Sequence, residues 1–447
     1  MVAIIGRPNT GKSTLFNSML RRRIAIVSDI PGTTRDHIAG KIEGDDCDYL
    51  LLDTGGMGGG TLDKDFEADV HAQSLLAIES ADLILFTLNG KEDLTKSDRE
   101  IAHILRKAHR KHAPIVLVLT KCDNKKVEEN ALLTAAELGI GDETITVSAL
   151  NNQGTSDVEE LIERHLKSMH FGKQEKRDAA AVPRIAVIGK PNVGKSSLIN
   201  ALMSDTQRLS SPRLVSDVPG TTRDITDTTI RREGDEFIFV DTAGLKKRGH
   251  KAEEIEFFAY VRTLRAIEDA DVVVLVLDAS EPPSKQDKHI AGLSDEAGKG
   301  LILLLNKSDL LSAEDREQRL EEFRDAFLFC RYAPVLLCSA LTREKLPKIF
   351  DLISMAHRNR HRRLSTKELQ TWLRDSVGGK PLGEILTTKF ITQGKDPPPT
   401  FILFVKNPVH VRVSQLRYLS NRIREVFEFT GTPIRWITKG PRDKTLD

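Results

Sequence analysis

The sequence predicts an α/β protein with two tandem domains, each a mostly parallel sheet with helices on both faces, followed by a small α+β domain. Short, almost continuous apolar runs alternate with amphipathic stretches over residues 1–355, which is the pattern of parallel strands buried on both faces. Five short motifs occur twice in the same order, and the balance of charge changes near residue 356. A length of 447 residues fits about three domains of ~100–200 residues each.

The predicted strands follow one another at similar spacing in the two α/β domains. In residues 1–170 they are Val2–Ile5, Tyr49–Leu52, Leu83–Leu88, Ile115–Leu119 and Ile145–Val147, with helices such as Ser97–Lys111 and Asp157–Lys167 between them. In residues 183–355 they are Arg184–Ile188, Phe237–Val240, Val272–Leu277, Leu301–Leu305 and Val335–Leu337. Residues 171–182 lack apolar periodicity, so we expect a linker there.

Each α/β domain carries a glycine-rich motif directly after its first predicted strand. The motif G-x-x-x-x-G-K-S occurs at residues 6–13 and again at residues 189–196. Its glycines let backbone N–H groups and the following helix N-terminus face a phosphate. The lysine, Lys12 or Lys195, then reaches the β- and γ-phosphates, and the serine, Ser13 or Ser196, can bind Mg²⁺. A chance glycine-rich turn would not recur in this context, so the motif indicates a P-loop in each domain.

The other motifs repeat at nearly constant offsets, between 183 residues (Lys12 to Lys195) and 191 residues (Ser148 to Ser339). Val27–Asp36 recurs as Val215–Asp224, Asp53–Gly56 as Asp241–Gly244, Thr120–Asp123 as Asn306–Asp309, and Ser148–Leu150 as Ser339–Leu341. Such offsets indicate one domain duplicated in tandem.

The residue types of these motifs suit the chemistry of a nucleotide switch. An aspartate that closes an apolar strand, Asp53 or Asp241, places a carboxylate beside the metal. A threonine in the preceding segment, Thr34 or Thr222, can bind Mg²⁺ while the third phosphate is present and leave afterwards.

The motif at residues 306–309 is predicted to select guanine over adenine in the bound nucleotide. Its carboxylate, Asp309, can accept both the ring N–H and the exocyclic amine of guanine, and adenine presents no such donor pair. Recognition of this kind discriminates strongly, because a wrong base leaves buried polar groups unpaired.

The five motifs in this order are similar to those of small GTPase domains of the translation-factor-related class. Two tandem copies followed by a small basic domain resemble the bacterial ribosome-assembly GTPase family Der, also called EngA, over roughly residues 1–440. The resemblance implies hydrolysis of GTP to GDP and phosphate with Mg²⁺, coupled to maturation of the large ribosomal subunit precursor through contact with ribosomal RNA.

The resemblance also explains a missing side chain. Many GTPases orient the attacking water with a glutamine just after the D-x-x-G glycine, but here those positions hold Met57 and Leu245. The resemblance implies that a K⁺ ion, held by Asn9 and Asn192, replaces an arginine finger worth roughly 10³–10⁵ in rate. The alternative is a nucleotide switch without turnover.

The resulting site prediction carries the motif residues over position by position. The nucleotide-binding residues of the first domain are Gly6, Arg7, Pro8, Asn9, Thr10, Gly11, Lys12, Ser13, Thr14, Asp53, Thr54, Gly55, Gly56, Met57, Thr120, Lys121, Asp123, Ser148 and Ala149. Those of the second are Gly189, Lys190, Pro191, Asn192, Val193, Gly194, Lys195, Ser196, Ser197, Asp241, Thr242, Ala243, Gly244, Leu245, Asn306, Lys307, Asp309, Ser339 and Ala340. The Mg²⁺ ligands are Ser13, Thr34, Asp53, Ser196, Thr222 and Asp241, and the catalytic residues are Asn9, Lys12, Thr34, Asn192, Lys195 and Thr222.

Three positions depart from the family pattern or differ between the domains. Thr120 stands where asparagine is usual, and a hydroxyl cannot make the two-sided contacts of an amide, which puts the guanine affinity of the first domain in doubt. Thr10 replaces a valine, with little expected effect. The segment Lys246–Arg248 is basic in the second domain only; it is either a solvated surface run or an RNA contact gated by nucleotide.

Residues 356–440 form the small third domain, and residues 441–447 a tail. The predicted order is a helix at Ser365–Val377, strands at Ile385–Gln393 and Phe401–Val405, a helix at Gln415–Phe427 and a strand at Ile434–Thr438. This order resembles the KH-like domain that ends the family. The G-x-x-G loop with which KH domains clamp nucleic acid is absent between the expected helices.

Charge favours an RNA contact for this domain. Residues 356–447 hold 18 Lys and Arg against 8 Asp and Glu, which leaves 48 basic and 57 acidic residues in the rest of the chain. Phosphate neutralisation by such a domain gives affinity without sequence choice. The alternative is a protein-docking domain whose charge keeps it soluble.

Composition limits the remaining function classes. No apolar run approaches the ~20 residues of a membrane span, and Met1 leads straight into a strand without a leader pattern. The four cysteines form no C-x-x-C and are expected to be free thiols in a reducing cytoplasm. We expect a monomer without a DNA partner. A tRNA-modification GTPase, which usually has one GTPase domain and a cysteine-bearing tail, and a scaffold that binds GTP without turnover stay open as alternatives.

Overall fold

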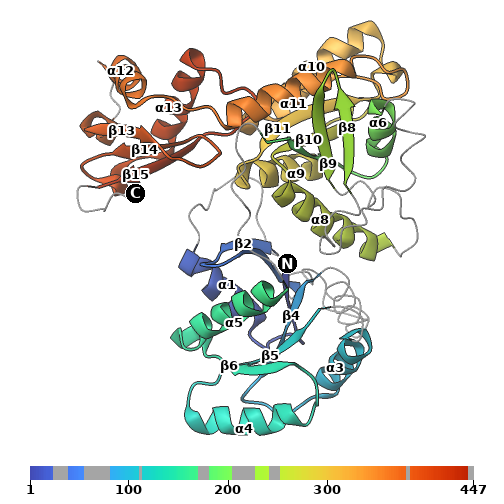
Figure 1. Ribbon diagram of the computed structural model, residues 1–447, viewed down its shortest axis with the longest axis vertical. Coiled ribbons are helices and arrows are strands. Elements are labelled where there is room, and N and C mark those ends of the chain that lie inside the picture. Colours follow the sequence, from blue (N-terminus) through green and yellow to red (C-terminus); the bar gives the residue numbers. More distant parts are fainter. Residues whose placement is uncertain are drawn as a thin grey trace. The chain divides into compact units, whose positions relative to one another are not determined.

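The computed structural model confirms two mostly parallel α/β sheets and a small third sheet, and it describes residues 1–23, 39–54, 81–109, 113–169, 181–203, 227–240, 252–378 and 383–440 (Figure 1). The described residues divide into two compact units. The first holds residues 1–169 and 252–261, and the second holds the rest of the described chain.

The first sheet has the strand order β2-β3-β1-β4-β5-β6, in which β2 is antiparallel to β3 and the other neighbours are parallel. Its strands are β1 (Val2–Ile5), β2 (Ala39–Glu43), β3 (Asp48–Asp53), β4 (Leu83–Asn89), β5 (Ile115–Thr120) and β6 (Glu143–Thr146). The helices are α1 (Lys12–Arg23), α3 (Lys96–His109), α4 (Lys125–Ala136) and α5 (Thr155–Ser168).

Successive side chains of β1 are buried in two different hydrophobic cores, one on each face of the sheet. Val2 and Ile4 lie in one hydrophobic cluster, while Ala3 and Ile5 lie in the other. This is the two-residue period of a strand with both faces covered, and it explains why the central strands are almost continuously apolar.

The second sheet repeats the arrangement in the order β12-β11-β10-β7-β9-β8, with β8 antiparallel to β9. Its strands are β7 (Arg184–Ile188), β8 (Thr228–Arg232), β9 (Asp235–Val240), β10 (Val272–Asp278), β11 (Gly300–Asn306) and β12 (Val335–Leu337). The helices are α6 (Lys195–Leu202), α8 (Ala252–Asp269), α9 (Lys285–Glu296), α10 (Ala313–Ala326) and α11 (Pro347–Arg360).

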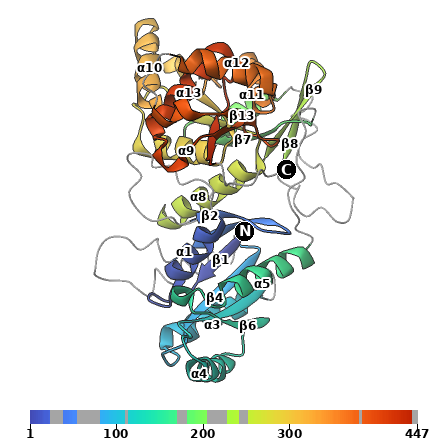
Figure 2. The same ribbon diagram turned by 90° about the vertical axis from the view of Figure 1, so that its left-hand side faces the viewer.

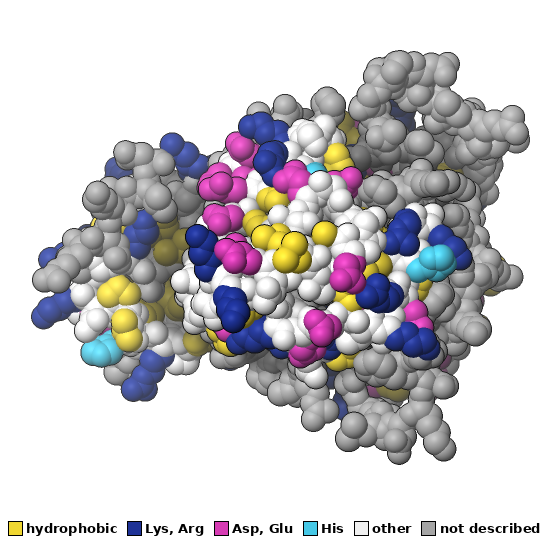
Figure 3. All heavy atoms as spheres, turned by 90° about the horizontal axis from the view of Figure 1, so that it is seen from below, with side chains coloured by type: hydrophobic (Ala, Val, Ile, Leu, Met, Phe, Trp, Pro, Cys, Tyr) yellow, Lys and Arg dark blue, Asp and Glu magenta, His cyan; other side chains and the backbone are white. Residues whose placement is uncertain are grey.

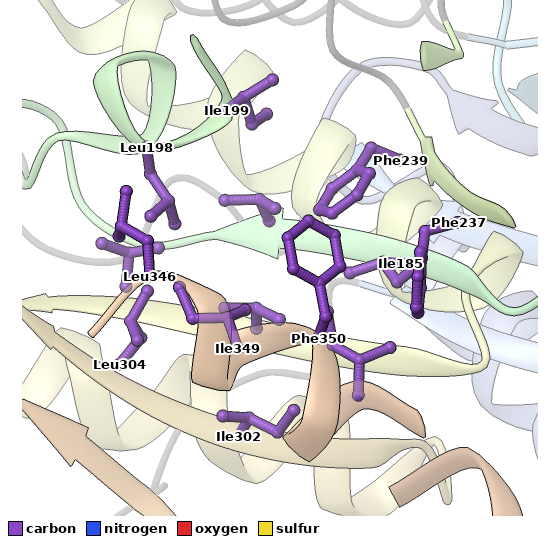
Figure 4. Packing of buried hydrophobic residues seen from close by; sticks show 14 of the residues in the cluster. Ile185, Leu198, Ile199, Phe237, Phe239, Ile302, Leu304, Leu346, Ile349 and Phe350 are labelled. Atoms are coloured by element: carbon purple, nitrogen blue, oxygen red, sulfur yellow. The ribbon is translucent and has the colours of Figure 1, made fainter. Parts of the chain in front are cut away.

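Helix α11 closes one core of the second domain. Figure 4 shows Ile349 and Phe350 of this helix among Ile185, Phe237 and Phe239 of the sheet. The rings of Phe237 and Phe350 lie 4.9 Å apart. The helix runs across the predicted domain boundary between residues 355 and 356.

The C-terminal domain is a sheet in the order β13-β14-β15 with two helices on one face (Figure 1, Figure 2). Its elements are α12 (Thr366–Val377), β13 (Phe390–Gln393), β14 (Thr400–Phe404), α13 (Val413–Val426) and β15 (Arg435–Lys439). Ser365 caps α12 together with Glu368.

The prediction of one strand over Ile385–Gln393 is wrong in its first half. Residues Gly383–Thr387 form a short 3₁₀ helix, and the strand begins at Phe390. The Thr387 hydroxyl donates to the Glu384 carbonyl at 2.7 Å, and the Thr388 hydroxyl to the Ile385 carbonyl at 2.6 Å. Local side-chain bonds of this kind compete with a strand ladder.

The turn after α13 attaches the C-terminal domain to the second α/β domain. The Leu301 amide donates to the Gly431 carbonyl at 2.8 Å, and the Gly431 amide donates to the Tyr332 carbonyl at 2.7 Å. Gly431 has a φ of 80°, and a Cβ there would lie 2.7 Å from the Ala356 Cβ. Only glycine therefore fits this turn.

A buried polar group completes the attachment. The Tyr332 hydroxyl donates to Asp295 Oδ1 at 2.6 Å, and the Arg424 guanidinium lies 4.9 Å from the Tyr332 ring centroid. Burial raises the pKa of Asp295 and of Tyr332, and it lowers the pKa of Arg424 to about 10. Arg360 and Arg435 donate to the carbonyls of Gly298 and Glu296. Part of the basic excess therefore serves attachment.

Surface composition is mixed on the side of the first domain where α4 lies (Figure 3). Acidic and basic side chains both lie around a small hydrophobic group there, with several acidic ones next to one another. Among the residues the structure describes, no helix has the length and apolarity needed to cross a membrane.

Candidate nucleotide-binding sites

Both glycine-rich loops lie between the end of a central strand and the start of a helix, and their backbones match. Asn9 and Asn192 have φ values of 64° and 65°, and the glycines that follow them, Gly11 and Gly194, have 87° and 96°. A Cβ on Gly189 would lie 2.3 Å from the Val276 carbonyl oxygen, so the loop passes β10 too closely for any side chain. The two motifs thus adopt the same loop shape, with left-handed residues at matching positions, and such a loop is typical of an anion-binding site.

The two motif lysines sit over their own loops. Lys12 Nζ donates to the carbonyls of Gly6 and Arg7, both at 2.8 Å. Lys195 Nζ donates to the carbonyls of Gly189 and Lys190, at 2.8 and 2.5 Å. Burial lowers the pKa of both amines, for Lys195 to about 8, and in the first domain the charge of Asp53 opposes the shift.

The first domain brings two predicted Mg²⁺ ligands together. Asp53 ends β3, and its Oδ2 accepts a hydrogen bond from the Ser13 hydroxyl at 2.6 Å. The carboxylate is buried, with 2% of Asp53 exposed. Hard oxygen donors at this separation are the ligands that Mg²⁺ prefers, so the residues present fit the ion.

Several predicted site residues lie outside the described part of the chain. They are Thr34, Gly55, Gly56 and Met57 of the first domain, and Thr222, Asp241, Thr242, Ala243, Gly244 and Leu245 of the second. The segment Lys246–Arg248 also lies outside it. The roles of all of them stay predictions.

In the second domain, Asn306 joins the glycine-rich loop to the Ser-Ala-Leu loop. Its Nδ2 donates to the Val193 carbonyl at 2.9 Å, and its Oδ1 accepts from the Ala340 amide at 2.9 Å. Asp309 accepts a hydrogen bond from the Ser339 hydroxyl. These contacts bring the loops that carry Asn306, Asp309 and Ala340 together, and their binding of the nucleotide stays a prediction.

The corresponding contacts of the first domain are fewer. The Thr120 hydroxyl lies near the Thr10 carbonyl and 3.0 Å from the Leu88 carbonyl. One hydroxyl hydrogen can serve only one of these acceptors at a time. Lys121 Nζ donates to the Asn9 carbonyl at 2.7 Å, and Asp123 accepts from the Ser148 hydroxyl at 2.6 Å. In the described chain, the bond from Asn306 to Ala340 has no counterpart here.

Thr10 has a matching partner that the sequence pattern did not reveal. Its hydroxyl lies 2.9 Å from the Thr87 hydroxyl, and Thr87 donates to the Ile5 carbonyl at 3.0 Å. The second domain has Val193 and Val276 at the corresponding places. The Thr10 hydroxyl also lies 2.9 Å from the Arg7 carbonyl, so it has partners in this buried site, and the small effect expected of Thr10 stays a prediction.

In each domain, one aspartate forms an ion pair with a basic residue of the glycine-rich loop. Arg7 Nε donates to Asp98 Oδ2 at 3.1 Å, and Lys190 Nζ lies 3.2 Å from Asp287 Oδ2. Each aspartate also accepts hydrogen bonds from the threonine or serine that caps its helix, at 2.7 and 2.6 Å. Sequence reasoning missed these residues, although the signal [ST]-x-x-D occurs in both domains at residues 95–98 and 284–287.

Comparison with known proteins agrees with this geometry. Residues 1–121 and 184–307 match the family described as 50S ribosome-binding GTPase. Residues 363–439 match the family described as KH-domain-like of EngA bacterial GTPase enzymes, C-terminal.

Similar proteins cover the whole chain. GTPase Der of a Geobacillus species is 40% identical over 447 residues, which covers 98% of each chain. GTPase Der of Heliobacterium modesticaldum is 40% identical over 453 residues, covering 100% of this chain and 99% of that protein. Among solved structures, elongation factor SelB of Methanococcus maripaludis is 20% identical, with a TM-score of 0.29 over 38% of this chain and 33% of that one.

Proposed function

The chain belongs to the GTPase Der family and hydrolyses GTP, and from this premise we propose that it acts in assembly of the large ribosomal subunit by contacting ribosomal RNA. The C-terminal domain supplies the contact, and the two GTPase domains set when it is made. The observation that carries the proposal is the charge of residues 356–447. This segment holds 18 basic and 8 acidic residues, whereas the rest of the chain is acidic.

Exposed cations of the C-terminal domain support a contact with phosphate. Lys389, Lys406 and Arg417 are exposed, whereas Arg360, Arg424 and Arg435 bond to carbonyls within the protein. The first three are therefore candidates for neutralising RNA phosphates, together with other exposed cations of the domain such as Lys367, Lys395 and Arg412.

We assign the roles within each site as the motifs suggest. Lys12 and Lys195 hold the β- and γ-phosphates, Asp309 and Asp123 read guanine, and Ser13 with Asp53 binds Mg²⁺. Mg²⁺ supplies charge neutralisation between the phosphates when it is bound. Asn9 and Asn192 hold K⁺, which offsets the missing glutamine at Met57 and Leu245. We also propose that the protein is located in the cytoplasm.

Sedimentation with ribosomal subunits tests the proposal. The full chain should co-sediment with large subunits when loaded with a GTP analogue, and less so with GDP. Because each lost phosphate contact reduces the log–log salt slope by about 0.7–0.9, the triple variant Lys389→Ala, Lys406→Ala, Arg417→Ala should show a shallower slope. Binding that ignores both nucleotide and these cations would contradict the proposal.

A further inference from the structure

The open face of the C-terminal sheet carries two phenylalanines side by side. The helices α12 and α13 cover the face with Ile391, Phe401 and Leu403, which are buried. On the other face, Phe390 of β13 stands directly opposite Phe404 of β14, and their ring centroids lie 5.7 Å apart. Phe390 is 39% exposed. No described helix of the C-terminal domain covers this face (Figure 1).

Strand register arranges this face in rows. The first row is Phe390, Phe404 and Lys439, and the second is Thr392, Ile402 and Ile437. Ile437 is also 40% exposed. The third row pairs Thr400 with Arg435, and Arg435 donates to the Glu296 carbonyl of the second GTPase domain at 2.5 Å. The attached end of the sheet is therefore the third row, and the aromatic row lies at the opposite end.

The chemistry of this face suits unpaired nucleotides. Every base has an apolar π-face that can stack on an aromatic ring, and a sheet that presents neighbouring aromatic side chains is a known platform for single-stranded RNA. The side chains of the three rows include Lys439 and Arg435 and no carboxylate.

We propose that the Phe390–Phe404 face of the C-terminal sheet binds single-stranded RNA by stacking bases on the two rings, with backbone phosphates toward Lys439 in the same row. The proposal rests on the proposed function in that RNA is the partner, and it names the surface and the kind of nucleotide. It also gives this domain a way to hold unpaired bases without a G-x-x-G loop.

Substitutions that separate ring stacking from apolar packing test the proposal. The full chain carrying Phe390→Leu and Phe404→Leu keeps apolar side chains but loses both rings, whereas Phe390→Tyr with Phe404→Tyr keeps the rings. The control is Phe329→Leu, which removes a ring of similar exposure, 38%, on the second GTPase domain. The probe is a short single-stranded RNA that contains 2-aminopurine, whose fluorescence falls on stacking.

We expect the Leu pair to weaken binding at least ~5-fold, the lower end for one stacked base, and to abolish the fluorescence change. The salt slope should stay unchanged because no phosphate contact is lost. The Tyr pair and Phe329→Leu should behave as the unchanged chain does.

Two results would overturn the proposal. One is a Leu pair that binds and quenches as the unchanged chain does. The other is a Leu pair that binds RNA normally while Phe390→Ala with Phe404→Ala loses large subunits, which would make the face a protein-packing surface. If the unchanged chain binds no RNA and no large subunits, it is the proposed function that fails.

Discussion

Asn306 and Thr120 occupy the same position in the two GTPase domains, yet they make different hydrogen bonds. The amide of Asn306 has a donor and an acceptor and therefore reaches both Val193 and Ala340. The hydroxyl of Thr120 reaches the glycine-rich loop and β4. A single side chain thus decides whether the glycine-rich loop and the Ser-Ala-Leu loop are joined directly.

Exchanging the two residues should weaken nucleotide binding by the second domain and strengthen it in the first. Because a hydrogen bond contributes about 1 kcal/mol net, Asn306→Thr should weaken GDP binding by the second domain roughly 5-fold. Thr120→Asn should strengthen binding by the first domain. Titration with a fluorescent GDP analogue, with the other site disabled by Lys12→Ala or Lys195→Ala, measures each effect. Unchanged affinities would show that the bridge does not support the nucleotide.

The choice of monovalent cation tests the roles of Asn9 and Asn192. We expect hydrolysis to be much faster in K⁺ than in Na⁺, because the smaller ion fills the site poorly. Asn192→Ala should remove most of the difference in the second domain and leave GDP affinity nearly intact. Phosphate release, measured in matched chloride salts, reports both rates. Equal rates in the two salts would refute the assignment of K⁺.

Nucleotide binding should be linked to protonation of Lys195. Its pKa without nucleotide is about 8, below the usual 10.5, and bound phosphates raise it by favouring the charged amine. Binding therefore takes up protons near pH 8, and affinity falls as pH rises above that value. Calorimetry at pH 8 in two buffers of different ionisation enthalpy measures the uptake. With the first site disabled by Lys12→Ala, Lys195→Arg, which stays charged, should abolish this uptake.

At the scale of elements, Asp287, the third residue of α9, both completes the capping box of the helix and contacts the glycine-rich loop. Asp287 accepts from Ser284 at the helix start and lies beside Lys190. Asp98 of α3 does the same with Thr95 and Arg7.

Two substitutions at Asp287 separate its roles. Asp287→Ala removes the cap and the ion pair and should destabilise the start of α9 by about 1 kcal/mol. Asp287→Asn keeps an acceptor for Ser284 and should retain most of that stability, while releasing Lys190. Hydrogen exchange of the α9 amides measures the first effect. Equal exchange in the Ala variant and the unchanged chain would contradict a capping role.

The central strands and the glycine-rich loops could be predicted because their signals are local. A buried parallel strand such as β4 is a continuous apolar run, and a P-loop needs glycines at fixed places. The edge strand β2 escaped prediction because Ile42 is its only buried side chain among charged and small neighbours. The Thr10–Thr87 pair and the Lys190–Asp287 pair join residues far apart in sequence, so only the folded chain brings them together.

At the scale of the whole molecule, the attachment of the C-terminal domain depends on a few buried polar groups. Tyr332, Asp295 and Arg424 form one such group, and each would be left unsatisfied in part if a partner were removed. A buried group that loses its hydrogen-bond partner costs about 1–3 kcal/mol.

Tyr332→Phe should loosen this attachment without unfolding either domain. The amides of Leu301 and Gly431, which bond across it, should exchange faster with solvent by about 5-fold or more. Tyr418→Phe is the matched control, because its hydroxyl bonds to Ser376 within the C-terminal domain. Faster exchange in both variants, or in neither, would show that the Tyr332 hydroxyl does not hold the domains together.

Helix α9 begins at the glycine-rich loop and ends at the attachment of the C-terminal domain, where Asp295 and Glu296 accept from Tyr332 and Arg435. Twelve residues span ~18 Å at 1.5 Å per residue. If RNA on the C-terminal domain changes the affinity of the second site for GTP by some factor, GTP must change the affinity for RNA by the same factor. By this reciprocity, an RNA ligand on the C-terminal domain would select the nucleotide state of the second site as much as the nucleotide selects the RNA.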